Sequence, residues 1–338
     1  LLHRTTDLAC LHFPWPSVSD YEQDDPHPLN GPDIPADTGA FAFLPVPGVV
    51  FLQETFLGYH RKDCKCSPGT FPPQFFTALK QLLFFFKAES IMVALNQYRR
   101  VIYMKFEVYP ELFEALPNAC FGVVTVKGVD NTKEAPEIEA LLAENIKKCE
   151  AKYEGKKVKE QPEIVPYREA FRTLGINTNK FMCSIEALLT RIAKGKGFPH
   201  INAVVDLGNA VSIQYDLPIG AHDTDTIPEA LCVRAAKEGD HFTPFGSDQA
   251  ETPDVGEMIY ASGQEVRTRR WTWRQSEIGK ITEETKNLFF PIDGFTDINK
   301  DKVLEARDAL ADLLKKTFDC QVEVGFVDKE HPVFSCDL

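Results

Sequence analysis

The sequence predicts an α+β fold, with a mostly antiparallel sheet flanked by helices and preceded by an irregular segment rich in Pro and Phe. From residue 104 onward, helix and strand patterns follow one another without regular β-α-β alternation, which is typical of this class. Hydrophobic residues make up 43% and charged residues 26% of the 338 residues, as in ordinary globular chains. Residues 1–103 differ, because they hold 11 of the 23 prolines and 11 of the 25 phenylalanines.

Each element after residue 104 is predicted from its hydrophobic period and its end signals. The stretch 120–127 is β-branched and apolar and is closed by Gly128, which predicts a strand. The stretch 135–153 has Ile138, Leu142 and Ile146 at the spacing of an amphipathic helix. The remaining predictions are helices at 167–174 (ended by Gly175), 184–194 (with Ser184 as N-cap) and 302–318; strands at 201–207, 231–235, 258–261, 266–273, 288–292 and 321–327; and a helix or strand at 211–213.

The first 103 residues show no sustained period except at 75–93, where one helix could form with Phe on every side. The orderly pattern begins at Met104, shortly after Arg99 and Arg100. If both arginines are encoded AGG, the message carries a ribosome-binding site ahead of a start codon. One hypothesis is therefore that residues 1–103 are translated upstream sequence and that 104–338 is the functional domain. The alternative is a genuine Pro-rich extension.

The net charge of −13, from 37 basic and 50 acidic residues, argues against a protein that binds long nucleic acid mainly by charge. Any nucleic acid must then be held by a local patch. No apolar run is long enough for a membrane span and no secretory signal is visible, so we expect a soluble, cytoplasmic protein without membrane contact. Of the nine cysteines only Cys64 and Cys66 are close, and the second pair of a zinc site is missing, so neither a metal nor a cofactor is expected.

Two segments place polar groups where sites are commonly built. In FPHINAVVDLGN, Asp206 and Asn209 follow an apolar run together with Gly208; the alternative is an ordinary tight turn. In DLPIGAHDTD, Gly220 allows close approach of a ligand, and His222 and Asp223 supply groups that hold a water or a ribose hydroxyl. The alternative for this second segment is a solvated acidic loop.

A third segment, RTRRWTWRQSE, concentrates arginine and tryptophan in an acidic chain. Arginine pairs with phosphate and indole rings stack on bases, so this tract predicts contact with nucleic acid. Read as one strand, it puts alternate residues on one face: Arg267, Arg269, Trp271 and Trp273 on the first, Arg270 and Arg274 on the second. The alternative is a half-buried strand with internal cation–π pairs.

Two smaller features flank these segments. Glu277 follows the basic tract as a carboxylate that positive neighbours would keep ionised. The short KGKG sequence contains Lys194 and Lys196; it is too short for a phosphate-binding P-loop, and it is either a basic turn that touches a phosphate or an ordinary helix end.

The run 184–225, the GE pair at 256–257 and the RRWTWRQSE tract together resemble the B3/B4 domain, the tRNA-binding and editing module of the phenylalanyl-tRNA synthetase beta chain, and most of all its freestanding relatives. The resemblance covers about 104–338 and is strongest over 167–293. It implies a B3/B4-like fold. By this resemblance Asn209 falls on the editing-pocket Asn and Glu277 approximately on the Glu that recognises the amino acid. Gly220 stands where the synthetase has a pocket His, and His222 stands where it has Phe.

The function implied by the resemblance is hydrolysis of a mischarged aminoacyl-tRNA by a freestanding deacylase, with the aminoacylated 3′ end of tRNA as partner. Asn209, Glu277, His222 and Asp223 are the expected catalytic group, with Asp206 and Gly220 in the pocket. The expected RNA contacts are Arg267, Arg269, Arg270, Trp271, Trp273, Arg274, Lys194 and Lys196. The alternatives are a non-catalytic RNA-binding module and a protein that binds a free amino acid in the same pocket.

Overall fold

The computed structural model describes residues 104–336, so the predictions for residues 1–103 lie outside the described residues. The order of elements is β1 (Met104–Val108), α3 (Pro110–Ala115), β2 (Ala119–Lys127), α4 (Pro136–Tyr153), η3 (Val158–Glu160), α5 (Val165–Thr173), α6 (Ser184–Ala193), α7 (Ala203–Tyr215), β3 (His222–Asp223), η4 (Thr224–Thr226), β4 (Leu231–Ala235), β5 (Met258–Ser262), β6 (Glu265–Arg269), β7 (Arg274–Gln275), β8 (Asn287–Phe295), α8 (Lys300–Phe318), β9 (Gln321–Val327) and β10 (Val333–Cys336).

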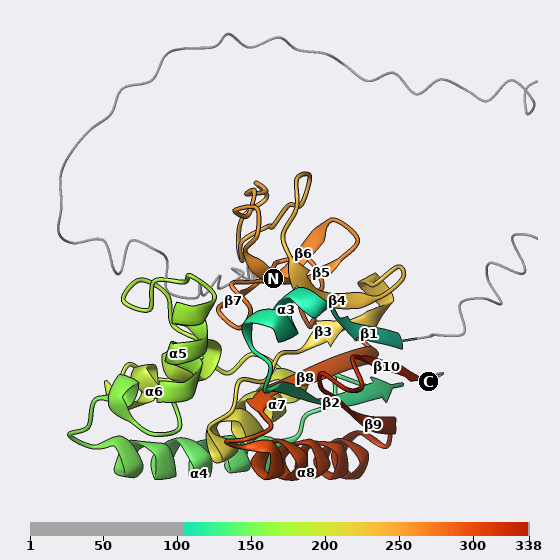
Figure 1. Cartoon of the computed structure of the whole chain (residues 1–338). Coiled ribbons are helices and arrows are strands. Elements are labelled where there is room, and N and C mark those ends of the chain that lie inside the picture. The colour runs from blue at the N-terminus through green and yellow to red at the C-terminus, as the bar shows by residue number, and fades with distance from the viewer. Residues whose placement is uncertain (1–103, 337–338) are drawn as a thin grey trace, which may run out of the picture. The chain divides into compact units, whose positions relative to one another are not determined.

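The described strands form two sheets (Figure 1). One has six strands in the order β10-β1-β4-β5-β6-β7, and the other has four in the order β3-β8-β2-β9. Each neighbouring pair is antiparallel except β1 and β4, which run parallel. The predicted α+β class with a mostly antiparallel sheet is therefore confirmed.

An aromatic cluster joins the two sheets into one core. Phe106 of β1 lies with its ring centroid 5.5 Å from that of Phe121 on β2, 5.0 Å from that of Phe289 on β8 and 6.1 Å from that of Tyr260 on β5. Helix α8 packs on β2, β8 and β9, and α7 lies between α8 and α4. Figure 1 shows α4 and α8 one after the other along the lower edge of this domain.

Most predicted elements are present with small shifts of their ends. The helices at 135–153, 167–174 and 302–318 correspond to α4, α5 and α8, and the strands at 231–235 and 321–327 correspond to β4 and β9. Helix α6 also forms, but Cys183 rather than Ser184 is its N-cap, without a side-chain cap bond.

The predicted strand at 201–207 is wrong, because this segment enters helix α7. The Asn202 side chain accepts a hydrogen bond from the Val205 amide at 3.0 Å, and the Asp206 carboxylate accepts one from the Ile201 amide at 3.2 Å. The first bond satisfies an amide that the first turn of a helix leaves unpaired, and the second ties the residue before the N-cap to the helix. The alternative interpretation of 206–209 as a tight turn is also wrong, since these residues lie within α7.

The single strand predicted over 266–273 is wrong as well. Strand β6 ends at Arg269, and Arg270 and Trp271 both adopt left-handed backbone angles, with φ of 48° and 59°. Two successive residues in this region reverse the chain, which returns as β7 antiparallel to β6. The alternation of faces expected along the tract therefore stops at Arg269.

None of the helices between residues 104 and 336 is long and apolar enough to cross a membrane. The same residues contain no group of three or more His, Cys, Asp or Glu side chains arranged to hold a metal ion.

Candidate functional site

A cavity of about 170 Å³ lies among helix α7, the segment that leads into β3, the turn between β6 and β7, and strand β8. Its wall is mainly apolar, with contributions from Leu188, Val205 and Ile281. A cavity of this size holds roughly one aromatic ring, because an engineered apolar cavity of about 150 Å³ binds benzene. This is the size of one amino-acid side chain.

Helix α7 supplies Asn209 to this cavity. The Asn209 side chain is half-buried and forms no hydrogen bond with any residue in 104–336. One position earlier, Gly208 lies on β8, where an added Cβ would meet the Phe290 ring at 3.5 Å. This contact of α7 with β8 places the next residue, Asn209, at the cavity. Asp206 is not on the cavity wall, since it is fully buried at the start of α7, where it pairs with His200.

Gly220 and His222 line the cavity from the neighbouring segment. His222 is 1% exposed, and its ring stacks on Tyr260 at 5.9 Å between centroids. Burial, together with the nearby positive charge of Arg267, lowers the pKa of His222 to about 3, so the imidazole is neutral at physiological pH. Its Nδ1 atom is buried without a hydrogen-bond partner within the described residues. A Cβ added at Gly220 would lie 3.4 Å from Nε2 of His222, so the imidazole sits beside the place where a side chain at 220 would begin.

The turn after β6 presents Trp271, Trp273 and Arg274 to the cavity. Trp271 is fully buried in its wall, whereas Trp273 and Arg274 are half-buried. The Arg274 guanidinium lies 5.9 Å from the Trp273 ring centroid. Arg270 stacks on Trp273 and on Phe181, at 4.7 and 3.9 Å from the ring centroids. The cation–π alternative therefore describes Arg270 well.

The structure corrects the expectation that Arg267 and Arg269 contact RNA. Arg267 is 1% exposed and donates hydrogen bonds to the carbonyl oxygen of Thr226, at 2.6 Å, and to Glu265. Arg269 is 7% exposed, and its guanidinium donates two hydrogen bonds to Glu257, at 2.9 and 2.8 Å. Guanidinium groups engaged inside the fold in this way are not available to a phosphate.

Two predicted catalytic residues lie off the cavity wall. The Asp223 carboxylate accepts hydrogen bonds from the Asp225 amide and from the Thr285 hydroxyl, at 2.9 and 2.7 Å, so it caps the following turn. Glu277 pairs with Lys280 and accepts a hydrogen bond from the Gly246 amide at 3.1 Å. Lys280 does line the cavity, so Glu277 reaches the site through its lysine partner.

Sequence reasoning missed Asp293, which lines the same cavity from β8. It is 3% exposed, and the Tyr260 hydroxyl donates a hydrogen bond of 2.6 Å to its carboxylate. Burial raises the pKa of Asp293 to about 7, although the Tyr260 and Trp271 side chains oppose that rise. The available signal was one acidic residue inside the otherwise apolar run LFFPIDGF.

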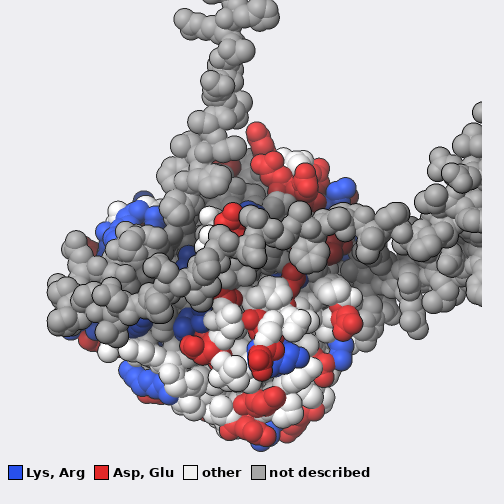
Figure 2. All heavy atoms as spheres, turned by 90° about the horizontal axis from the view of Figure 1, so that it is seen from above, with Lys and Arg blue, Asp and Glu red and all other residues white. Residues whose placement is uncertain are grey.

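The charge around the domain is mixed rather than uniformly basic. Figure 2 shows acidic and basic side chains interspersed over the visible surface, with acidic groups gathered along its upper edge. Lys194 and Lys196 are exposed in the turn after α6, apart from the cavity wall. At the cavity itself the cationic side chains are Arg274 and Lys280.

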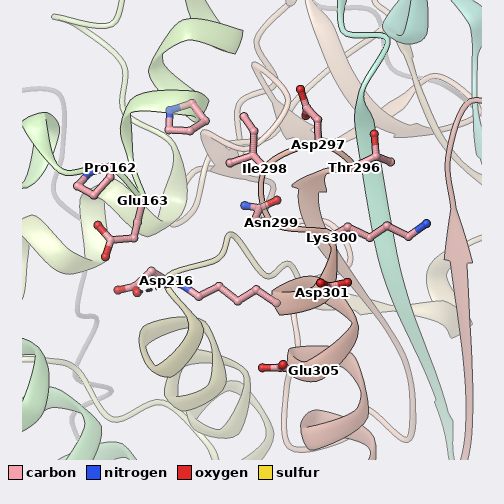
Figure 3. A pocket seen from close by; sticks show the side chains of 12 residues that line it. Pro162, Glu163, Asp216, Thr296, Asp297, Ile298, Asn299, Lys300, Asp301 and Glu305 are labelled. Atoms are coloured by element: carbon pink, nitrogen blue, oxygen red, sulfur yellow. Dashed lines mark hydrogen bonds and ion pairs between the residues drawn. The ribbon is translucent and has the colours of Figure 1, made fainter.

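A second hollow, of about 630 Å³, lies between α5 and the start of α8. Figure 3 shows Glu163 and Asp216 on one side of it and Asp301 and Glu305 on the other. Asp216 is already engaged by Lys152, at 2.8 Å, and by other donors. Lys300 and Lys302 also line this hollow, but Lys302 pairs with Asp216, and none of the predicted site residues lies here, so the smaller cavity is the candidate site.

Comparison with known proteins agrees with the resemblance drawn from the sequence. Residues 166–319 match the B3/4 domain, and this range contains every residue that lines the candidate cavity. A curated relative is the phenylalanine–tRNA ligase beta subunit of Staphylococcus haemolyticus (strain JCSC1435), which is 26% identical over 130 residues, or 38% of this chain and 16% of the relative. The matched part of the chain thus spans about one sixth of that relative's length. A solved structure, an N-terminal fragment of the phenylalanyl-tRNA synthetase beta subunit from Pyrococcus horikoshii, is 11% identical with a TM-score of 0.37, covering 65% of this chain and 50% of that one.

Proposed function

We propose that this chain binds the aminoacylated 3′ end of a tRNA and hydrolyses the ester of a mischarged amino acid, acting in trans. The observation that carries the proposal is the gathering of Asn209, Gly220, His222 and Arg274 around one cavity, inside the segment that matches the B3/4 domain. These residues are separated by up to 65 positions in the sequence, and the fold brings them to the same cavity.

The cavity suits the acyl part of such a substrate. Its volume of about 170 Å³ matches one amino-acid side chain, and its apolar wall favours a hydrophobic one. The terminal ribose and the phosphates would stay outside, next to Arg274 and Lys280. Arginine pairs with phosphate through two parallel hydrogen bonds, and the half-buried Trp273 supplies an aromatic ring for contact with a base.

The reaction needs a placed water rather than a covalent nucleophile. The water oxygen bonds to the ester carbonyl carbon, and the bond from that carbon to the ribose oxygen breaks. One proton of the water goes to the ribose oxygen, which becomes a hydroxyl, and the other goes to solvent as the amino acid leaves as its carboxylate. The Asn209 amide and the neutral His222 imidazole are polar groups of the cavity able to orient this water. Because the pKa of His222 is about 3, its role at neutral pH is hydrogen bonding, not proton transfer.

His222 also matters for the difference between this chain and the synthetase at position 220, where this chain has Gly220 and the resemblance places a histidine. An imidazole that lies 3.4 Å from the absent Cβ of Gly220 brings a ring nitrogen to the same part of the pocket from two residues later. Glu277 acts on the substrate through Lys280, its partner at the cavity wall.

The test is to incubate the full chain with a panel of correctly charged and mischarged aminoacyl-tRNAs and to follow amino-acid release. Release of one amino acid that is lost in Asn209→Ala, and slowed in Glu277→Ala, supports the proposal. Retention of tRNA without release of any amino acid contradicts hydrolysis and identifies an RNA-binding module. If the chain neither retains tRNA nor releases an amino acid, both hydrolysis and RNA binding are contradicted. A protein that binds a small molecule is then the remaining alternative.

A further inference from the structure

Asp293 is a buried carboxylate without a counter-charge. Within residues 104–336 no Lys, Arg or His forms an ion pair with it; its side-chain neighbours are the Tyr260 hydroxyl, at 2.6 Å, and the Trp271 indole. All three side chains are at most 3% exposed, and all three line the cavity. The only open side of this group is therefore the cavity.

The apolar sequence around Asp293 makes it energetically unfavourable to bury an ionised carboxylate there. Strand β8 reads NLFFPIDGF and is buried from Leu288 to its end. An ionised carboxylate taken out of water without a cation destabilises a fold by several kcal/mol, so buried charges are normally paired. An unpaired one that faces a ligand cavity is a candidate binding group.

We propose that the Asp293 carboxylate, held by the Tyr260 hydroxyl, binds the protonated amino group of the ligand that occupies this cavity. The ligand class is then a small primary amine with a short apolar body, such as an amino acid or its ester. The proposal rests on the proposed function in that it uses the same cavity. It adds an orientation of the substrate in the cavity, with the ammonium group toward Asp293 and the anionic part toward Arg274 and Lys280.

The ammonium has two possible sources, the α-amino group shared by all amino acids or the terminal amine of a lysine-like side chain. Both offer the same chemistry to Asp293. L-phenylalaninamide carries only the first, and N-acetyl-L-lysinamide carries only the second. Binding of one of these compounds to the cavity identifies the source of the ammonium group. If neither compound binds, the proposal is overturned.

Among the buried groups packed against Asp293, the carboxylate alone changes charge near pH 7. Burial raises the pKa of Tyr260 on β5 and of Tyr167 on α5 well above their usual value, and raises the pKa of Cys120 on β2 to about 12. His222 on β3 stays neutral. The cationic side chains at the cavity wall are Arg274 and Lys280.

Since burial raises the pKa of Asp293 to about 7, an ammonium ligand should bind about tenfold more tightly at pH 8 than at pH 6. The probe must keep its own charge over this range. An α-amino group with a pKa near 8 begins to lose its proton there, whereas an alkylamine with a pKa near 10 does not.

The experiment is a calorimetric titration of the full chain with 2-phenylethylamine and with its neutral isostere 2-phenylethanol, at pH 6 and pH 8. The amine is expected to bind at least tenfold more tightly than the alcohol at pH 8 and to lose that advantage in Asp293→Asn. Glu163→Gln is the matched control, because Glu163 is a half-buried carboxylate that does not line the cavity, and it should leave both affinities unchanged.

Equal binding of the two probes to the wild-type chain, or an amine preference that survives in Asp293→Asn, overturns the proposal. If Asp293→Asn does not fold, Tyr260→Phe serves instead: it removes the hydrogen bond that favours the ionised carboxylate, so the pH midpoint of amine binding should move upward, and an unmoved midpoint overturns the proposal. Because no RNA is used, the outcome is independent of the deacylation assay, and amine binding without ester hydrolysis would refute the proposed function alone.

Discussion

Replacing Asp293 by Asn should make the protein more stable at high pH, the reverse of what most core substitutions do. Asn has the same shape and still accepts the Tyr260 hydrogen bond, but it carries no charge that burial disfavours. Burial raises the pKa of Asp293 from 3.8 to about 7, so the folded state holds a proton that the unfolded state releases between these values. The contribution of Asp293 to the stability of the wild-type protein therefore falls as pH rises from about 4 to about 7.

The size of the effect follows from the same shift. With 1.36 kcal/mol per pKa unit, the stability of Asp293→Asn relative to wild type should rise by about 2–3 kcal/mol between pH 5 and pH 8. Urea unfolding of both proteins at the two pH values, followed by tryptophan fluorescence, measures it. The pKa of His222 is displaced equally in both proteins and cancels in the difference. A difference that does not change with pH would refute the assignment of a high pKa to Asp293.

Three further substitutions test other parts of the site and fold. Gly220→Ala places a methyl group 3.2 Å from Cγ of Pro291 and 3.4 Å from Nε2 of His222 and narrows the cavity, so deacylation should slow; unchanged rates would contradict the placement of the acyl group. Arg274→Gln should weaken tRNA binding and reduce the slope of log K against log salt concentration by about 1, because one phosphate contact is lost. An unchanged slope in filter-binding assays would show that Arg274 does not contact the RNA. Glu257→Gln breaks a buried ion pair and should cost about 3 kcal/mol in urea unfolding, whereas Glu251→Gln, at a carboxylate that is 55% exposed, should cost less than about 1 kcal/mol; equal costs would contradict a structural role for the buried pair.

Elements with a clear local period could be predicted from the sequence. Helix α4 has apolar residues at three- and four-residue spacing, and β4 and β9 are short apolar or alternating runs between polar turns, so neighbouring residues alone determine their type. The stretch 201–207 failed because a short apolar run fits a strand or a helix equally well. Asn202, three residues before Val205, is the N-cap of the helix that forms here, and this signal favours a helix over a strand.

The site was predicted in part for a similar reason. Asn209, Gly220 and His222 carry polar or permissive character that is visible in the sequence, and the resemblance to the B3/B4 domain selected them. Asp293 was missed because its importance comes from burial and from Tyr260, which lies 33 residues earlier. Arg269 was misassigned because its bidentate partner Glu257 lies on another part of the chain, and composition does not reveal which arginines are already paired.

The central claim is that the cavity beside α7 holds the acyl group of an aminoacyl-tRNA during hydrolysis. Single-turnover release of the amino acid by wild type, Asn209→Ala and Asn179→Ala tests it most directly, since Asn179 is exposed and does not line the cavity. The account predicts a rate at least tenfold lower in Asn209→Ala and a wild-type rate in Asn179→Ala. Equal rates in all three proteins, or no release above the spontaneous rate, would contradict it.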